Sequence, residues 1–131
     1  MEPAATRGVG MSKSLLFLCY PNCSTCKRAQ RFLDKAGVTY TLRNIKTDNP
    51  SAEELGRWHQ LSGLPLRRFF NTSGIKYKEL GLKDRLSEMD ESQQLALLAA
   101  DGMLVRRPLL IGKEFVLVGF REDQWQENLE P

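Results

Sequence analysis

Apolar and polar positions recur along the chain with two different periods, which divide it into predicted strands and helices. Residues 13–19 form a short continuous apolar run, typical of a strand that is buried on both faces. A helical pattern follows over residues 25–36 and ends at Gly37, a common helix stop. Residues 38–43 then alternate between apolar and polar, which indicates a second strand. A strand, a helix and a strand with short links predict a βαβ unit with parallel strands.

A block of helices is expected between residues 51 and 102. Ser51 with Glu54, and Asp90 with Gln93, have the spacing of capping boxes, in which each side chain bonds the other residue's backbone N–H. The predicted helices cover residues 51–62, 64–70, part of 82–89, and 90–101. The first of them carries an apolar stripe of Leu55, Trp58 and Leu61. Residues 71–81 are expected to form a loop that is anchored by Tyr77 and Leu80.

Two further apolar strands are predicted at residues 109–111 and 115–118. Gly112 and Lys113 between them fit a tight hairpin turn. Residues 121–129 have the pattern of a last helix. The side chains of that helix that are expected on the sheet are Trp125 and Leu129. The whole chain is therefore expected to be an α/β domain with a mixed four-stranded sheet and a helical insertion between strands two and three.

Composition and charge narrow the function classes. The chain has 131 residues and a formal net charge of +3, with basic and acidic residues mixed along it. This suits one domain and gives no argument for direct nucleic-acid binding. No apolar run approaches the ~18 residues of a membrane span, and residues 1–10 lack the apolar core of a secretory signal. We expect a cytoplasmic monomer with one domain at residues 13–131, preceded by a tag or disordered extension at residues 1–12.

Cys23 is the candidate nucleophile. It lies where the first predicted strand leads into the first predicted helix. Unpaired N–H groups and the helix dipole make such a position electropositive, which favours the reactive thiolate form of a cysteine. Cys26 follows after two residues and is the candidate resolving thiol. Ser24 or Thr25 is expected to cap the helix.

The other two cysteines have simpler interpretations beside a chemical one. A Cys-x-x-Cys spacing inside a βαβ unit is the redox signature of thioredoxin-like folds, and in a reducing compartment such a pair is usually catalytic or sensing. Cys26 also fits a packed position, because its helix face carries Ala29, Leu33 and Ala36. Cys19 ends a buried strand and is expected to be a core residue.

Two metal-site interpretations are disfavoured. Cys19, Cys23 and Cys26 have the spacing of an iron–sulfur ligand set, but Cys19 is predicted in a strand rather than in a shared loop. A structural zinc needs four ligands, and the remaining candidate is His59 on a distant helix. The sequence therefore predicts no metal site.

Two arginine pairs are candidates for anion binding. Arg106 and Arg107 precede Pro108 and the third predicted strand, and Arg67 and Arg68 open a short helix. Guanidinium groups offer a planar fork of donors to oxyanions, carboxylates and thiolates. Pro108 at the start of a strand is compatible with a cis peptide bond.

Five motifs, taken in order, resemble the arsenate reductase / Spx family of thioredoxin-like proteins over residues 14–129. They are Tyr-Pro-Asn-Cys-Ser-Thr-Cys-Lys at 20–27, Leu-Arg at 66–67, Glu-Leu-Gly-Leu at 79–82, Val-Arg-Arg-Pro-Leu-Leu-Ile at 105–111 and Val-Gly-Phe at 118–120. The resemblance implies a thioredoxin-like sheet with a helical insertion, an active Cys23 and a cis bond before Pro108. It also implies that Arg67 and Arg107 face Cys23 and bind an oxyanion.

Ser24, Thr25 and Pro108 are expected beside this oxyanion as part of the substrate site. The family's two branches imply different activities. Arsenate reductases coupled to glutaredoxin carry a third arginine after the hairpin, where this chain has Val-Gly-Phe at 118–120. Spx regulators carry a Cys-x-x-Cys redox switch, which Cys23 and Cys26 match, and bind RNA polymerase.

Both activities stay open at the level of the sequence. We expect a thiol-dependent oxidoreductase that reduces a small oxyanion or a protein disulfide through Cys23. It would use glutathione with glutaredoxin, or thioredoxin, as its reductant and partner, and hold no bound cofactor. The alternative is a redox-sensing regulator that binds RNA polymerase through a Cys23–Cys26 switch.

Overall fold

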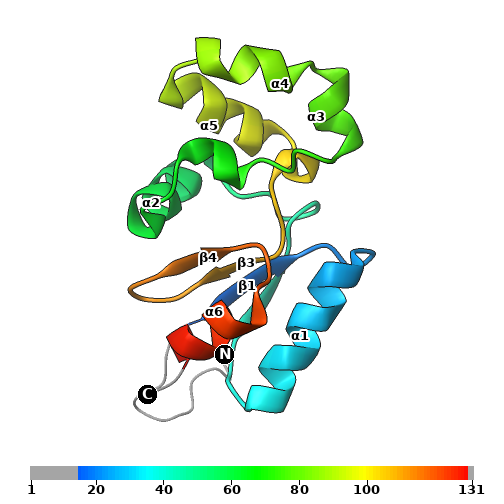
Figure 1. The fold of residues 1–131 in the computed structure, drawn as a ribbon, viewed down its shortest axis with the longest axis vertical. Coiled ribbons are helices and arrows are strands. Elements are labelled where there is room, and N and C mark those ends of the chain that lie inside the picture. The colour runs from blue at the N-terminus through cyan, green and yellow to red at the C-terminus, as the bar shows by residue number, and fades with distance from the viewer. Residues whose placement is uncertain (1–14, 130–131) are drawn as a thin grey trace. The chain divides into compact units, whose positions relative to one another are not determined.

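The computed structural model describes residues 15–129, which divide into two compact units (Figure 1). The sheet unit contains the described residues up to 43 and from 107 onward, and the helical unit contains residues 44–106. The predicted extension at residues 1–12 lies outside the described residues. No helix among residues 15–129 is long and apolar enough to cross a membrane.

The sheet unit contains a four-stranded mixed sheet with strand order β2-β1-β3-β4. Its elements are β1 (Leu16–Cys19), α1 (Ser24–Ala36), β2 (Thr41–Asn44), β3 (Leu109–Ile111), β4 (Val116–Val118) and α6 (Glu122–Leu129). Strand β3 pairs antiparallel with β1, where Leu18 faces Leu109, and with β4, where Leu109 faces Val118. Because the sheet is mixed, β2 runs parallel to β1, as the βαβ pattern predicts. The thioredoxin-like α/β fold expected from the sequence is confirmed.

Helices α1 and α6 cover one face of this sheet (Figure 1). Phe17 of β1 is fully buried there, and its ring meets the Trp125 ring edge-on at 6.1 Å. The Trp125 indole N–H donates to the Gly119 carbonyl at 3.1 Å, so this large aromatic residue is buried without an unpaired donor. Cys26, Ala29 and Leu33 place α1 on the same core. The predicted apolar face of α1 is confirmed except for Ala36, which lies exposed in the last turn.

The helical unit consists of four helices and three 3-10 turns. These are α2 (Ala52–Ser62), α3 (Ile75–Glu79), α4 (Leu82–Arg85) and α5 (Glu91–Ala100), with turns at Leu66–Phe69, Leu86–Glu88 and Gly102–Leu104. Both predicted capping boxes are confirmed: the Glu54 N–H donates to Ser51 Oγ at 3.1 Å, and the Gln93 N–H donates to Asp90 Oδ1 at 2.8 Å. Helices α2 and α5, which pack together, therefore each start at a defined residue.

Gly102 fixes how the chain leaves α5. A Cβ atom added to Gly102 would overlap the carbonyl oxygen of Ile45 and lie 2.5 Å from Asn49 Oδ1. The Asn49 side chain also donates to the Ala99 carbonyl at 2.7 Å, near the end of α5. The residue at 102 thus has to be a glycine for the turn after α5 to approach the chain that follows β2.

Several local predictions differ from the structure. The segment 71–81 was expected to be a loop but contains α3. The pattern gave no sign of this short helix, because it buries only Tyr77 and lacks an apolar period. Tyr77 is buried, as an anchor requires, whereas Leu80 is 36% exposed. Leu61 was expected on the apolar stripe of α2 but lies 44% exposed, one residue before the helix ends.

Two strand boundaries also shift. Strand β2 begins at Thr41 rather than at residue 38, because Tyr40 packs its ring on Phe17 at 5.6 Å instead of joining the ladder. The tight hairpin between β3 and β4 is confirmed, but its tip is one residue later than predicted. The Gly112 N–H donates to the Phe115 carbonyl at 2.8 Å, which places Lys113 and Glu114 in the turn.

Candidate functional site

Cys23 is the N-cap residue of α1, so the prediction that Ser24 or Thr25 caps this helix was wrong. The Cys23 backbone is extended (φ −98°, ψ 121°), its N–H donates to the Tyr20 carbonyl at 3.0 Å, and its carbonyl accepts from the Lys27 N–H at 3.1 Å. The turn that begins at Tyr20 therefore decides where the helix starts. The Cys23 side chain makes no capping bond, so its thiol lies at the positive end of α1.

The three cysteines differ in exposure. Cys23 is half-buried, whereas Cys26 is 2% and Cys19 is 6% exposed. All three are free thiols. A reagent from solvent can therefore reach Cys23 far more readily than the other two, as a nucleophile requires.

Cys26 lies in the first turn of α1, and its environment favours the protonated thiol form. A hydrogen bond with the Cys19 thiol and burial raise the pKa of Cys26 well above the ordinary value. The Tyr20 N–H, which donates to Cys26 Sγ at 3.3 Å, opposes that rise in pKa only in part. The same contact with Cys26 lowers the pKa of Cys19, against the effect of its burial. Cys19 is thus a core residue, as predicted, and also the hydrogen-bond partner of Cys26, which the sequence did not indicate.

The Arg107 side chain contacts the same turn, at the ring of Tyr20. Its guanidinium carbon lies 5.4 Å from the centroid of the Tyr20 ring, which is within the range of a cation–π contact. The Arg107–Pro108 peptide bond is cis, as predicted. The Pro108 carbonyl accepts from the Gly119 N–H at 2.8 Å, which ties the segment before β3 to the segment after β4.

Tyr20 is the residue that sequence reasoning missed. Its carbonyl positions Cys23, its N–H bonds Cys26, and its ring receives Arg107. The available signal was an aromatic residue between a buried strand and the Cys-x-x-Cys motif. A residue four positions before the start of α1 could not, however, be assigned these three contacts without the register of β1.

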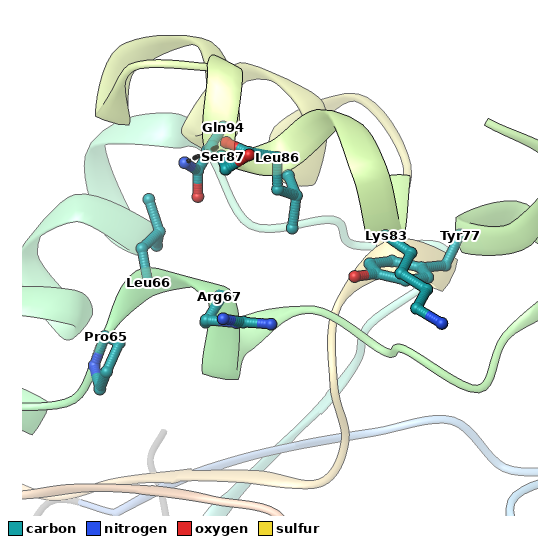
Figure 2. Close-up of a pocket in the computed structure, with 8 residues that line it drawn as sticks. All are labelled: Pro65, Leu66, Arg67, Tyr77, Lys83, Leu86, Ser87 and Gln94. Atoms are coloured by element: carbon teal, nitrogen blue, oxygen red, sulfur yellow. Dashed lines mark hydrogen bonds between the residues drawn. The ribbon is translucent and has the colours of Figure 1, made fainter. Parts of the chain in front are cut away.

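The other predicted binding residues are placed as follows. Ser24 is exposed and Thr25 is half-buried in the first turn of α1, next to Cys23. Arg67 belongs to the helical unit, where its exposed side chain lines a pocket in that unit (Figure 2). The prediction that Arg67 faces Cys23 therefore stays a prediction. Oxyanion binding by Ser24, Thr25 and Pro108 is likewise untested.

The segment after β4 carries no arginine at 118–120. Its aromatic residue, Phe120, packs on Trp125 with ring centroids 4.9 Å apart and receives the Arg28 guanidinium at 5.8 Å. Across residues 15–129 no group of three or more His, Cys, Asp or Glu side chains is arranged to hold a metal ion. His59 packs edge-on against Phe69 in the helical unit, with its Nδ1 3.8 Å from Glu91 Oε2.

The family model described as the ArsC family matches residues 18–128. Over 115 residues the chain is 50% identical to the uncharacterized protein YusI of Bacillus subtilis, covering 88% of this chain and 98% of that protein. It is 28% identical over 109 residues to the global transcriptional regulator Spx of Streptococcus agalactiae, covering 83% and 77% of the two chains.

Two solved structures extend this likeness to the fold. The crystal structure of an ArsC family related protein from Bacteroides fragilis has a TM-score of 0.85 and 52% identity, covering 87% of this chain and 96% of that one. An arsenate reductase from Vibrio cholerae has a TM-score of 0.81 and 27% identity, covering 90% and 99%. An arsenate reductase thus shares this fold, and a transcriptional regulator shares part of the sequence.

Proposed function

Because the chain belongs to the ArsC family, we propose that it is a thiol-dependent oxidoreductase that uses Cys23 as its nucleophile. The observation that carries the proposal is the position of Cys23 at the N-cap of α1, where its half-buried side chain makes no capping bond. The positive end of a helix supports a thiolate there, and the thiolate is the attacking form.

The proposed substrate is a disulfide. The Cys23 thiolate attacks one sulfur, a new S–S bond forms, and the other sulfur leaves as a thiolate that takes up a proton. A second thiol then attacks the mixed disulfide at the substrate sulfur, forms a disulfide with it, and releases Cys23 as a thiolate. Another thiol of the reductant resolves that disulfide, so two reductant thiols end as one disulfide and two electrons pass to the substrate. Glutathione with glutaredoxin, or thioredoxin, would supply these electrons. The protein itself needs no bound cofactor for either step.

Arg107 would stabilise the negative charge that develops on the leaving sulfur. Its contact with the Tyr20 ring holds the guanidinium at the turn that also positions Cys23. The lack of an arginine at 118–120 favours a disulfide over arsenate, because a tetrahedral oxyanion requires more donors than one thiolate does. Reduction of an oxyanion is therefore the second substrate to test.

Cys26 is the internal candidate for the second thiol. It lies one helical turn from Cys23, but its raised pKa keeps it protonated at neutral pH. We propose that an external thiol resolves most of the adduct near neutral pH, and that Cys26 competes as the pH rises.

The test is NADPH oxidation coupled to glutathione reductase with glutaredoxin, or to thioredoxin reductase with thioredoxin. Hydroxyethyl disulfide and arsenate are supplied in separate arms. The expected result is turnover of the disulfide above the rate of the reductant system alone, and this excess should disappear in Cys23→Ser and persist in Cys19→Ala. An excess rate that survives Cys23→Ser would show that Cys23 is not the nucleophile.

A redox-sensing regulator is the second candidate function. It is favoured by the 28% identity to Spx and by the close Cys23 and Cys26 pair. No turnover in any coupled assay, together with peroxide-dependent retention of purified RNA polymerase on the immobilised protein, would support the regulator and contradict the enzyme. Cys26→Ser is the matched variant, because it should abolish that peroxide dependence.

A further inference from the structure

A groove with a volume of about 400 Å³ lies beside α1 in the sheet unit. Its lining comes from α1, from the segment after β4 and from the first turn of α6, on one face of the sheet (Figure 1). The lining residues are Arg28, Arg31, Phe32, Lys35, Phe120 and Glu122. None of them takes part in the thiol chemistry proposed above, so the groove is available for a further role.

Two aromatic rings supply the apolar part of the lining. Phe32 and Phe120 pack together with ring centroids 5.7 Å apart, at the edge of the core around Trp125. Phe120 is held there by its edge-on contact with the Trp125 ring at 4.9 Å. Both phenylalanines are half-buried. An apolar side chain laid on them would therefore remove further apolar surface from water, which is favourable.

Three cations border these rings. Arg28, Arg31 and Lys35 occupy positions i, i+3 and i+7 of α1, which share one face of a helix. All three are exposed, and within residues 15–129 none of them forms an ion pair. The Arg28 guanidinium carbon lies 5.8 Å from the centroid of the Phe120 ring, a cation–π contact that supplies no counterion. The positive charge along this face is therefore uncompensated.

One carboxylate reduces this charge. Glu122 also lines the groove, and it lies in the first turn of α6, where the helix dipole favours an acidic residue. Three cations against one carboxylate leave a surplus of two positive charges in the lining. An acidic ligand is thus favoured over a neutral or basic one. The attraction should be strongest at low ionic strength, because these charges face solvent.

The face that carries the cations continues toward Cys23. Ser24, four residues before Arg28, lies on the same helix face and follows Cys23 directly. With a rise of about 1.5 Å per residue, Lys35 lies about 18 Å along α1 from Cys23. An extended peptide covers about 3.3 Å per residue, so about five or six residues span this distance. One short segment of a partner can therefore reach both the thiol and the whole groove.

The position beside Cys23 decides which kind of anion suits the groove. A nucleic acid would satisfy the charge, but it carries no disulfide for Cys23 to attack. A small disulfide reaches Cys23 without extending along α1. An acidic protein segment combines all the required features, namely carboxylates for the cations, an apolar side chain for the rings and a disulfide for the thiol.

We propose that the groove beside α1 docks an extended acidic segment of a protein whose disulfide Cys23 reduces. This rests on the proposed role of Cys23 as the nucleophile. The segment places carboxylates opposite the three cations and an apolar side chain on the two rings. Cys23 bonds one sulfur of the disulfide, the other sulfur leaves as a thiolate, and the reductant described above supplies the two electrons.

Binding is measured on the full chain of Cys23→Ser labelled with ¹⁵N, which cannot react. The probe is a peptide with serine in place of its cysteine, then a leucine and a run of glutamates; a second peptide has glutamines instead. The amide signals of residues 28–35 and 119–122 should shift together. The glutamate peptide should bind roughly tenfold more tightly, because each exposed ion pair adds only a small factor. This preference should disappear at ~1 M salt.

The variants assign the preference to the lining. Arg28→Gln and Arg31→Gln should each weaken binding of the glutamate peptide about threefold. Glu122→Gln should strengthen it by a similar factor, because it removes the opposing charge. Lys113→Gln is the matched control: Lys113 is exposed in the turn between β3 and β4, does not line the groove, and makes the same change in net charge. Its affinity should be unchanged.

Turnover links docking to the chemistry. Both peptides, now with a cysteine joined to mercaptoethanol as a mixed disulfide, are supplied to the original protein in the coupled assay. kcat/KM should be roughly tenfold higher for the glutamate peptide, through a lower KM. The ratio of its kcat/KM to that of hydroxyethyl disulfide should fall in Arg31→Gln and stay unchanged in Lys113→Gln. A variant that merely unfolds would lose both activities together.

Three results would overturn the docking site. They are equal affinity for the two peptides, equal weakening by Arg31→Gln and Lys113→Gln, and displacement of the glutamate peptide by an oligothymidylate of equal charge. The docking site and the role of Cys23 fail separately. Reduction of hydroxyethyl disulfide without a preference between the peptides would remove the docking site alone. Selective binding without turnover of any disulfide would remove the role of Cys23 and leave an acidic docking surface.

Discussion

In the helical unit, α2 and α5 each begin with a complete capping box, whereas in the sheet unit α1 begins at a cysteine that makes no capping bond. In α2 and α5 the side chains of Ser51 and Asp90 accept from the backbone N–H groups of Glu54 and Gln93. The side chains of Glu54 and Gln93 accept in turn from the backbone N–H groups of Ser51 and Asp90. A good N-cap side chain contributes typically ~1 kcal/mol over one that cannot cap. The start of α1 lacks that stabilisation.

The difference separates structural helix starts from a reactive one. A capping oxygen at residue 23 would occupy the donors that an incoming anion or a thiolate could use. Cys23 leaves those donors available and is held instead by backbone bonds to Tyr20 and Lys27. The comparison can be tested from both sides, through the chemistry of one unit and the stability of the other.

The largest effect is expected at Arg107. Arg107→Ala should slow disulfide reduction by roughly a hundred- to a thousandfold, the loss of ~2.7–4 kcal/mol that removal of one donor to developing charge typically brings. Arg107→Lys should also impair the rate, because a lysine keeps the charge but loses the planar fork. kcat/KM and the rate of Cys23 alkylation by iodoacetamide are the measurements.

Arg106→Ala is the control for this prediction. Its side chain is exposed, and its backbone N–H, which donates to the Phe69 carbonyl at 2.8 Å, is kept in the variant. Melting temperatures should be alike in both variants. Equal kinetic losses for Arg106→Ala and Arg107→Ala would remove Arg107 from the site.

The next effect concerns pH. Attack by Cys26 on a glutathione adduct of Cys23 requires the Cys26 thiolate, and the pKa of Cys26 is raised by its bond with Cys19 and by burial. Below that pKa the thiolate fraction grows tenfold per pH unit, so the rate should rise roughly a hundredfold from pH 7 to pH 9 without levelling. Mass spectrometry of the preformed adduct, without added thiol, follows the reaction.

Cys26→Ser should lack this internal reaction and still lose glutathione to added free glutathione. That external rate should level off near the ordinary thiol pKa of ~8.5. An internal rate that levels at pH 8 would contradict the strongly held proton at Cys26.

A smaller effect is expected in the helical unit. Ser51→Ala and Asp90→Ala each remove one capping side chain, and each should lower the free energy of unfolding by about 0.5–2 kcal/mol. Urea titration followed by circular dichroism measures this. Ser92→Ala, at an exposed position inside α5, is the matched control and should stay within about 0.5 kcal/mol. Losses no larger than that of the control would show that these capping boxes contribute little.

The smallest effect has the opposite sign. Cys23→Ser places a favoured N-cap residue at the start of α1 and should raise the free energy of unfolding by about 0.5–1 kcal/mol, while it abolishes thiol chemistry. The same urea titration applies. A less stable Cys23→Ser protein would mean that the thiol itself stabilises the turn.

Much of the fold could be predicted because its signals are local. The continuous apolar run of β1, the glycine after α1 and the Ser51 and Asp90 boxes each fix an element within a few residues. Helix α3 was missed for the same reason. Only Tyr77 of its five residues is buried, and Ile75 is 76% exposed, so no apolar period marks it.

The site was harder to predict because its contacts are not local. Serine and threonine are favoured N-caps, and this preference misplaced the start of α1, which the Tyr20 turn moves to Cys23. The bond between Cys19 and Cys26 depends on which way a strand end faces. The pocket that Arg67 lines depends on α3 and α4, whose side chains meet only after the helical unit has folded.

The strand pairing described above also orders the events of biosynthesis. Strand β1, which leads to Cys23, forms antiparallel pairs only with β3, where Leu18 meets Leu109. The entire helical unit lies between these two residues in the chain, so a ribosome releases it before β3 exists. Closing so long a loop carries a large entropy cost, which slows folding. The helical unit can therefore fold while β1 has only β2 beside it, and the sheet that leads to Cys23 is completed only near the end of synthesis.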